Sequence, residues 1–416
     1  MSKSHCYNSK AFLLFYLGLL SAFGPFVMDM YLPSLPSMTG YFHTSASAVQ
    51  WGLTSCMAGL AIGQLVFGML SDAYGRRRPL FVALCLFLLS TMGCLYAGTI
   101  GEFVVSRFVQ GLAGAGGVVL SRSVAADRYS ARELAAVLAV VGSINGVATV
   151  AAPVAGGLLD AVAGWQGIFW FLFVVGLLLV GVTSRFCETL APSCRKPWSF
   201  REVRAGFLSV LRNRGYVSNV MQYGLSMALL FTYISSAPFI MQRHFHLSPL
   251  TFSLFFGVNA LAMVGATGLS ARFAHMARAL HVASRGQFIF GLSLCVALAA
   301  GCPFWVYELL VFVLLAAVGL GFTASNALAM DSERDRAGVA SALLGAAGFA
   351  GGVVVTPLVG LGDILMTTGL LLVALSMSSW LLLRRATRFG HFLRLSGVDA
   401  YMFRGWTIMF LHAVFC

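Results

Sequence analysis

Twelve apolar segments, each about as long as a membrane-crossing helix, set the narrowest limit on how this chain can fold. A helix needs about 20 apolar residues to cross the hydrocarbon of a bilayer. Charged residues make up only 10% of the chain, against about 25% in soluble domains. The sequence therefore predicts an all-α membrane protein with spans at 11–32, 47–70, 79–98, 102–125, 134–159, 165–183, 216–241, 249–271, 286–301, 304–329, 337–360 and 363–383.

The basic residues are distributed unevenly between the two sides of the predicted membrane. If both termini are cytoplasmic, the connections on that side hold nearly all Lys and Arg, while Arg243 falls in an outer loop and Arg107 inside a span. Lys and Arg are enriched in cytoplasmic loops because they set the orientation of a membrane protein. We therefore interpret the net charge of +13 as a topology signal, and we expect no nucleic-acid partner.

The two halves of the chain share a spacing. Arg132 precedes Pro153 by 21 residues, and Arg336 precedes Pro357 by the same interval. Internal repeats of this kind are typical of transporters whose site lies between the halves. We predict two six-helix bundles, 1–184 and 215–386, a cytoplasmic linker, 185–214, and a cytoplasmic tail, 387–416, which ends in a segment too short to span and suited to the membrane surface.

The short connection GMLSDAYGRRRP, residues 68–79, concentrates charge between two apolar spans. Topology explains its arginines, but acidic residues contribute little to topology, so Asp72 needs another reason. Asp72 can pair with an arginine of its own loop and bind the N-terminus of a neighbouring helix while the cytoplasmic side is closed. The predicted gate comprises Gly68, Asp72, Gly75, Arg76 and Arg77.

Four motifs carry a resemblance to a known family. GMLSDAYGRRRP resembles the signature between the second and third helices of the major facilitator superfamily, and RFVQGLAGAGG (107–117) resembles its fourth-helix signature. AAPVAGG (151–157) resembles its antiporter motif, with Ala152 in place of the first glycine. MDMYLPSLP (28–36) is similar to the first helix of Bcr/CflA-type drug-resistance exporters.

The resemblance implies the major facilitator fold and a proton-driven multidrug exporter of the bacterial inner membrane. Its partners would be protons, small lipophilic substrates and the bilayer, and the protein would be a monomer. Pro153, Gly156 and Gly157 of the antiporter motif would seal the pathway against proton leak.

Charges inside the spans are costly and need a reason. Asp29 and Arg107 fall at compatible depths, so Asp29 could carry the proton while Arg107 supplies a fixed positive charge and Gln110 relays a hydrogen bond between them. Two alternatives stay open. Asp29 could be a helix end wetted by the outer interface, and Arg107 a structural anchor for backbone carbonyls. Glu308 fits a solvated helix cap better than a second proton site.

Five further polar side chains could line a substrate cavity, although each suits a helix–helix hydrogen bond equally well: Asn145, Tyr223, Tyr233, Asn259 and Asn326. The nine cysteines lack CxxC spacing and are interpreted as apolar fillers rather than disulfides or metal ligands.

Neither a nucleotide-binding loop nor a catalytic constellation is apparent, so we expect no enzyme activity, no metal and no cofactor. The predicted function is export of lipophilic drugs or toxic compounds by proton antiport through alternating access. The alternative is export of a polar metabolite, such as a sugar or an amino acid, by the same fold.

Overall fold

The computed structural model describes residues 9–129, 131–195, 208–333 and 337–388. Its regular structure within these ranges is helical. Eleven of its helical segments are long and apolar enough to cross a membrane. The principal helices are α1 (Lys10–Asp29), α2 (Leu35–Tyr41), α3 (Ala46–Tyr74), α4 (Arg77–Leu95), α5 (Ile100–Arg128), α6 (Ala131–Ser184), α8 (Arg214–Phe239), α9 (Pro249–Leu269), α10 (Met276–Ala299), α11 (Phe304–Ser332), α12 (Ala337–Val359) and α13 (Ile364–Arg388).

Helix α6 accounts for two of the predicted spans. Its 54 residues are broken at Gly164, where φ is 64° and ψ is −171°. A residue with a side chain rarely adopts a positive φ, whereas glycine does so at little cost. The two legs on either side of Gly164 cover the predicted spans 134–159 and 165–183, so the twelve-helix, all-α fold is confirmed.

The predicted boundary of one span is wrong. Helix α10 begins at Met276 rather than at residue 286, so that Arg278 and Arg285 lie within the helix. A search for uncharged apolar runs cannot find these first turns, because the charges that end the apolar run do not end the helix.

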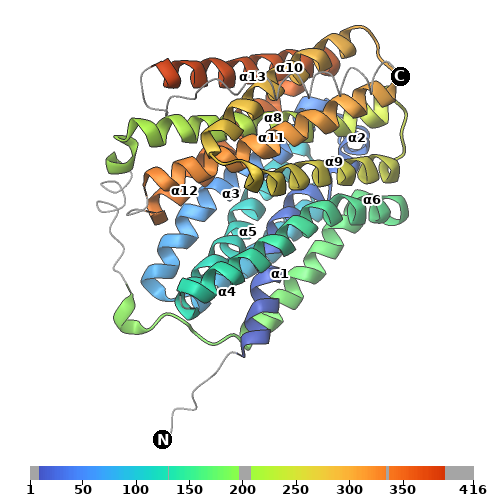
Figure 1. Ribbon diagram of the computed structural model, residues 1–416. Helices are drawn as coiled ribbons and strands as arrows, with labels where there is room; N and C mark the ends of the chain where they lie inside the picture. The colour runs from blue at the N-terminus through green and yellow to red at the C-terminus, as the bar shows by residue number, and fades with distance from the viewer. Residues whose placement is uncertain (1–8, 130, 196–207, 334–336, 389–416) are drawn as a thin grey trace, which may run out of the picture.

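The helices of the two halves gather on opposite sides of the molecule, blue to green in one half and yellow to red in the other (Figure 1). Within the first half, α3 and α5 cross so closely that a Cβ on Gly111 would overlap the carbonyl oxygen of Cys56. Close crossings at small residues are typical of membrane helices. Arg107, which is fully buried, lies one turn before this crossing.

Buried amides connect the helices of the second half. The Gln222 amide of α8 donates to the backbone carbonyl of Ser379 on α13 at 2.7 Å, and the Ser379 hydroxyl donates back to Gln222 at 2.7 Å. Gln287 of α10 donates to the Ser226 hydroxyl of α8 at 3.2 Å. A buried polar group is costly unless it is hydrogen-bonded, so these bonds fix α8, α10 and α13 relative to one another.

The two halves are joined at one end of the molecule, which we call the Pro36 end and define by residues 30–50, 235–248 and 353–360. Here Gln242 donates to the carbonyl of Pro33 at 2.8 Å, and Arg243 donates to the carbonyl of Pro36 at 3.0 Å. Gln50 donates to the carbonyl of Ser235 at 3.1 Å. Two further bonds between the halves lie here, from the Ser47 hydroxyl to the carbonyl of Pro357 and from Arg243 to the Thr39 hydroxyl, so several hydrogen bonds hold this end together.

At the opposite end lies the loop between α3 and α4. We call this end, residues 68–79, the Arg76 end. Arg76 forms hydrogen bonds here to Ser71, Asp72 and Asp127 of the first half and to Glu188 at the start of the linker.

Most cysteines in the described part of the chain are free, but not all. Cys56 and Cys94 are buried and free. Cys187, which follows α6, is disulfide-bonded, so the expectation that the cysteines form no disulfide is wrong there. Its place in a connection after the last apolar turn of α6 distinguishes it from the cysteines inside spans.

Candidate functional site

Asp29 is the last residue of α1. Its side chain is buried, with 5% of the residue exposed, and its Oδ1 has no hydrogen-bond partner in the structure. The alternative of a helix-end aspartate wetted at the interface does not describe this conformation. A buried carboxylate with an unpartnered oxygen is suited to binding a proton or a cation.

Arg107 of α5 anchors the end of α1. Its Nη1 donates to the carbonyl of Val27 at 3.0 Å, and its guanidinium lies 4.2 Å from the ring centroid of Tyr31. The last carbonyls of a helix lack partners within the helix, and a positive charge near them is favourable. The anchoring role proposed as an alternative for Arg107 is therefore visible in the structure.

Arg107 does not form an ion pair with Asp29 among the described contacts; it binds this end of α1 through the Val27 carbonyl, two residues before Asp29. Gln110 accepts a hydrogen bond from Arg107 at 2.5 Å and donates to the Thr91 hydroxyl of α4 at 2.8 Å. Gln110 thus connects Arg107 with α4, and the expected relay to Asp29 is not formed in this conformation. The Nε and Nη2 atoms of Arg107 are buried without partners.

The antiporter motif of α6 contacts both α1 and the second half. A Cβ on Gly156 would overlap the carbonyl oxygen of Met30, the residue after Asp29. A Cβ on Gly157 would overlap the Ser253 hydroxyl of α9. Pro153 is buried one turn earlier in the same helix. These small residues let α6 approach the backbone next to Asp29 and the facing helix at once.

Three buried polar side chains meet in the second half. The Asn259 amide nitrogen of α9 donates to Glu308 Oε1 on α11 at 2.9 Å and to the Tyr233 hydroxyl oxygen of α8 at 3.1 Å. Glu308 is only 7% exposed, so the interpretation as a solvated cap is wrong. It lies in the second turn of α11, where α8 and α9 cover it.

The other predicted cavity residues are spread over several helices. Tyr223 of α8 is buried, with its ring centroid 4.9 Å from that of Phe322 on α11. Asn145 of α6 and Asn326 of α11 are half-buried. A substrate-lining role for these residues remains a prediction.

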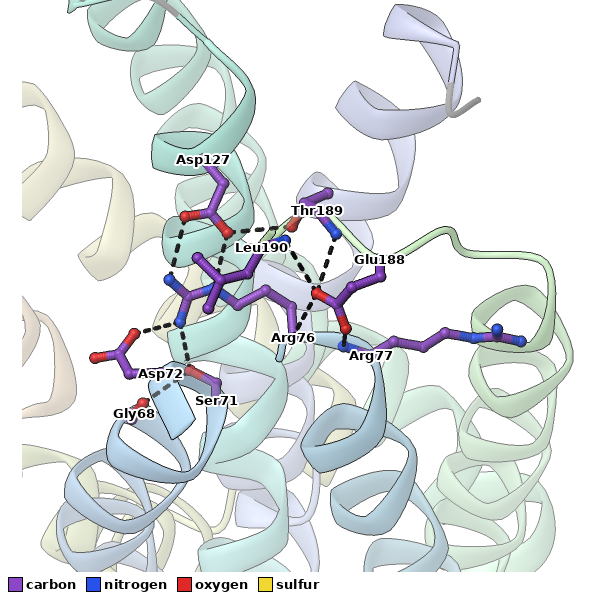
Figure 2. A network of polar contacts seen from close by, with 9 residues as sticks. All are labelled: Gly68, Ser71, Asp72, Arg76, Arg77, Asp127, Glu188, Thr189 and Leu190. Atoms are coloured by element: carbon purple, nitrogen blue, oxygen red, sulfur yellow. Dashed lines mark hydrogen bonds and ion pairs between the residues drawn. The ribbon is translucent and has the colours of Figure 1, made fainter. Parts of the chain in front are cut away.

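The Arg76 end carries a network of charges, shown in Figure 2. Arg76 donates to both carboxylate oxygens of Asp127 on α5, from Nε at 2.8 Å and from Nη2 at 3.1 Å. Its Nη1 donates to Asp72 at 2.5 Å and to the Ser71 hydroxyl at 2.7 Å. Burial by itself would lower the pKa of Arg76, but the hydrogen bonds and charges of Asp127 and Asp72 outweigh it, so the pKa lies above its usual value.

Glu188, in the chain segment after α6, caps the start of α4 (Figure 2). It accepts from the backbone nitrogens of Arg76 at 2.8 Å and Arg77 at 3.2 Å. An anion is favourable at a helix N-terminus, where backbone N–H groups lack partners. The Arg77 side chain donates to the carbonyl of Ser184 at 2.6 Å. The start of the linker is therefore fixed to the loop between α3 and α4.

The two glycines predicted for the gate differ. Gly75 has a φ of 91°, which residues with a side chain rarely adopt, and a Cβ there would approach Glu188 Oε2 to 2.5 Å. A Cβ on Gly68 would meet only Val119, at an ordinary 3.7 Å. No close approach requires glycine at position 68 in this conformation.

Sequence reasoning missed two acids of this network, Asp127 and Glu188, and misjudged Glu308. Asp127 lies next to Arg128, the last residue of α5, and Glu188 lies shortly after the end of α6 at Ser184. The available signal was the position of each acid at a helix end on the side of the arginine-rich loop. No group of three or more His, Cys, Asp and Glu suited to a metal ion occurs among the described residues.

The sequence is similar to those of known membrane transporters. The family model described as Major Facilitator Superfamily matches residues 17–356. An uncharacterized MFS-type transporter of Bacillus subtilis, YdgK, is 36% identical over 84% of this chain and 89% of its own. A bicyclomycin resistance protein homolog of Haemophilus influenzae is 29% identical over 82% and 87%. The multidrug resistance protein MdtL of Klebsiella pneumoniae is 28% identical over 86% and 92%.

A solved structure shows the same fold. The bacterial homolog of the human lysosomal transporter Spinster aligns with a TM-score of 0.70 over 92% of this chain and 97% of its own, at 15% identity.

Proposed function

We propose that this chain, which belongs to the major facilitator superfamily, exports lipophilic drugs or toxic compounds from the cytoplasm in exchange for protons. The observation that carries the proposal is the buried Asp29, whose Oδ1 lacks a partner and which follows by two residues the Val27 carbonyl that Arg107 binds. Relatives named for bicyclomycin resistance and multidrug resistance support the choice of substrate class.

The clustering of basic residues supports a cytoplasmic location for the Arg76 end, in a bacterial inner membrane with both termini cytoplasmic. The Pro36 end is then external. Because the hydrogen bonds between the halves described above lie at the Pro36 end, the structure corresponds to an inward-facing state. The proton acceptor Asp29 lies directly before this closed end in the chain.

A transport cycle follows from this arrangement. In the outward-facing state the Pro36 end is open, and Asp29 takes up a proton from outside. In the inward-facing state a lipophilic compound enters from the cytoplasm and displaces the proton. Abundant apolar side chains favour such a compound, since a polar substrate needs several fixed hydrogen-bonding groups. Arg76 stays charged throughout, and the exposed Asp72 would contact the neighbouring half only when the Arg76 end closes.

The experiment is drug-driven proton movement in proteoliposomes, with wild type compared with Asp29→Asn. Proton movement upon addition of ethidium should fall in the variant to the level of protein-free liposomes. The matched control is Asp363→Asn, because Asp363 is exposed and caps the backbone of Met366, a bond that asparagine also makes. Unchanged coupling in Asp29→Asn would make Asp29 structural. Absence of proton movement in wild type with every lipophilic compound would favour the polar-metabolite alternative.

A further inference from the structure

We propose that Glu308 is a second proton-binding carboxylate, so that each half of the transporter carries one acid that takes part in proton exchange. The inference rests on the proposed function and extends it from one coupling acid to two. It assigns a role in the second half to a residue outside the four family motifs.

The geometry isolates Glu308 from water and from cations. Only 7% of the residue is exposed, and Oε2 is buried without a hydrogen-bond partner. Oε1 accepts from Asn259 at 2.9 Å, a bond that tolerates either protonation state. A buried carboxylate charge without a cation is costly, and inside a membrane such acids face functional pathways.

The groups that surround Glu308 offer no countercharge. Tyr233 from α8 and Tyr307 from α11 are its titratable neighbours, and Cys302 lies beside Tyr307 in the connection that precedes α11. From α9 the neutral Asn259 contacts it. Among the described residues no ion pair reaches Glu308. A proton is therefore the simplest means of neutralising this carboxylate while the Pro36 end is closed.

Glu308 and Asp29 occupy comparable positions in their halves. Asp29 ends α1 next to the Pro36 end. Glu308 lies in the second turn of α11, which starts at Phe304. The connection between α8 and α9, which belongs to the Pro36 end, lies on the same side of the molecule as this start of α11. Opening of this end would therefore give both acids access to the same external solution. Two protons would then enter for each substrate that leaves.

The stoichiometry changes the electrical behaviour of transport. Exchange of two protons for one monovalent cation moves one net charge inward, whereas exchange of one proton moves none. One net charge makes the attainable substrate gradient respond by about 50-fold per 100 mV. Loss of the second proton site removes this response and leaves exchange driven by the pH gradient.

The test uses full-length protein in proteoliposomes with ethidium, a permanent monovalent cation, and a potassium-diffusion potential. Wild type should move ethidium in response to the potential without a pH gradient. Glu308→Gln, which keeps an acceptor for Asn259, should lose this response and retain exchange driven by a pH gradient. The matched control is Glu102→Gln, because Glu102 is an exposed acid that caps Gly98 at 2.8 Å and should behave as wild type.

A second readout is independent of transport. Infrared difference spectra of the purified protein across a pH titration should contain the carbonyl band of a protonated carboxylic acid that Glu308→Gln removes. If that band is unchanged and the potential response persists in Glu308→Gln, the inference is wrong while Asp29 coupling stands. If wild type shows no exchange at all, the proposed function fails, and the infrared band alone decides whether Glu308 binds a proton.

Discussion

The two acids that hold Arg76 should contribute very different amounts to stability. The side chain of Asp127 is 13% exposed and binds Arg76 through two hydrogen bonds. The side chain of Asp72 is 54% exposed. Breaking a buried pair costs about 3–5 kcal/mol, and a hydrogen bond to a charged group about 1.5–3 kcal/mol, whereas exposed pairs contribute about 0–1 kcal/mol.

We therefore expect Asp127→Asn to lower the free energy of unfolding by about 2–4 kcal/mol, because asparagine keeps one acceptor oxygen but leaves the Arg76 charge undercompensated. Asp72→Asn should lower it by less than about 1 kcal/mol. Titration with dodecyl sulfate of protein held in mild-detergent micelles, followed by tryptophan fluorescence, measures both values.

A double-mutant cycle with Arg76→Gln separates the interaction from other effects of each substitution. The coupling of Arg76 with Asp127 should exceed its coupling with Asp72 by at least about 1 kcal/mol. Equal couplings, or a larger one for Asp72, would refute the argument from burial.

Two further predictions concern α6 and the Pro36 end. Gly156→Ala should destabilise the protein by about 1–3 kcal/mol and abolish transport, because its Cβ overlaps the carbonyl oxygen of Met30, directly after α1; thermal melting is the assay. Gly146→Ala, where a Cβ meets nothing within 4 Å, should be neutral or stabilise by about 0.5–1 kcal/mol. Arg243→Gln should destabilise the closed Pro36 end by about 1 kcal/mol, because it removes the hydrogen bond to the Pro36 carbonyl. The outward-facing population should therefore rise several-fold. The check is the distance between spin labels at the exposed Tyr41 and His246, which should lengthen; an unchanged distance distribution would contradict it.

Most of the fold could be predicted because hydrocarbon thickness dictates the length of an apolar run. That rule locates the spans, and the gap between two of them coincides with the break at Gly164. It fails for α10, whose first turns carry Arg278 and Arg285. Helix boundaries depend on backbone hydrogen bonds, which continue past the edge of the apolar run.

The contacts of the site were predictable only in part. The sequence places Asp72 and Arg76 four residues apart, so their pairing follows from local geometry. Asp127 lies 51 residues from Arg76 in the chain, and only the packing of α5 against α3 and α4 brings the two together. Burial of Glu308 likewise depends on α8 and α9, and no local sequence pattern around Glu308 predicts this burial.

Under the proposed function, the short segment that follows Asp29 would connect proton binding with opening of the Pro36 end. Met30 in this segment packs its carbonyl oxygen against Gly156, and the carbonyls of Pro33 and Pro36 accept hydrogen bonds from the second half. Opening the Pro36 end must break those two bonds and release this backbone. The movement changes the surroundings of Asp29, which is continuous with it, and by linkage a change in the protonation of Asp29 must bias the opening to the same extent. A rigid segment that transmits both events is sufficient for this coupling, without a direct bond between Asp29 and Arg107.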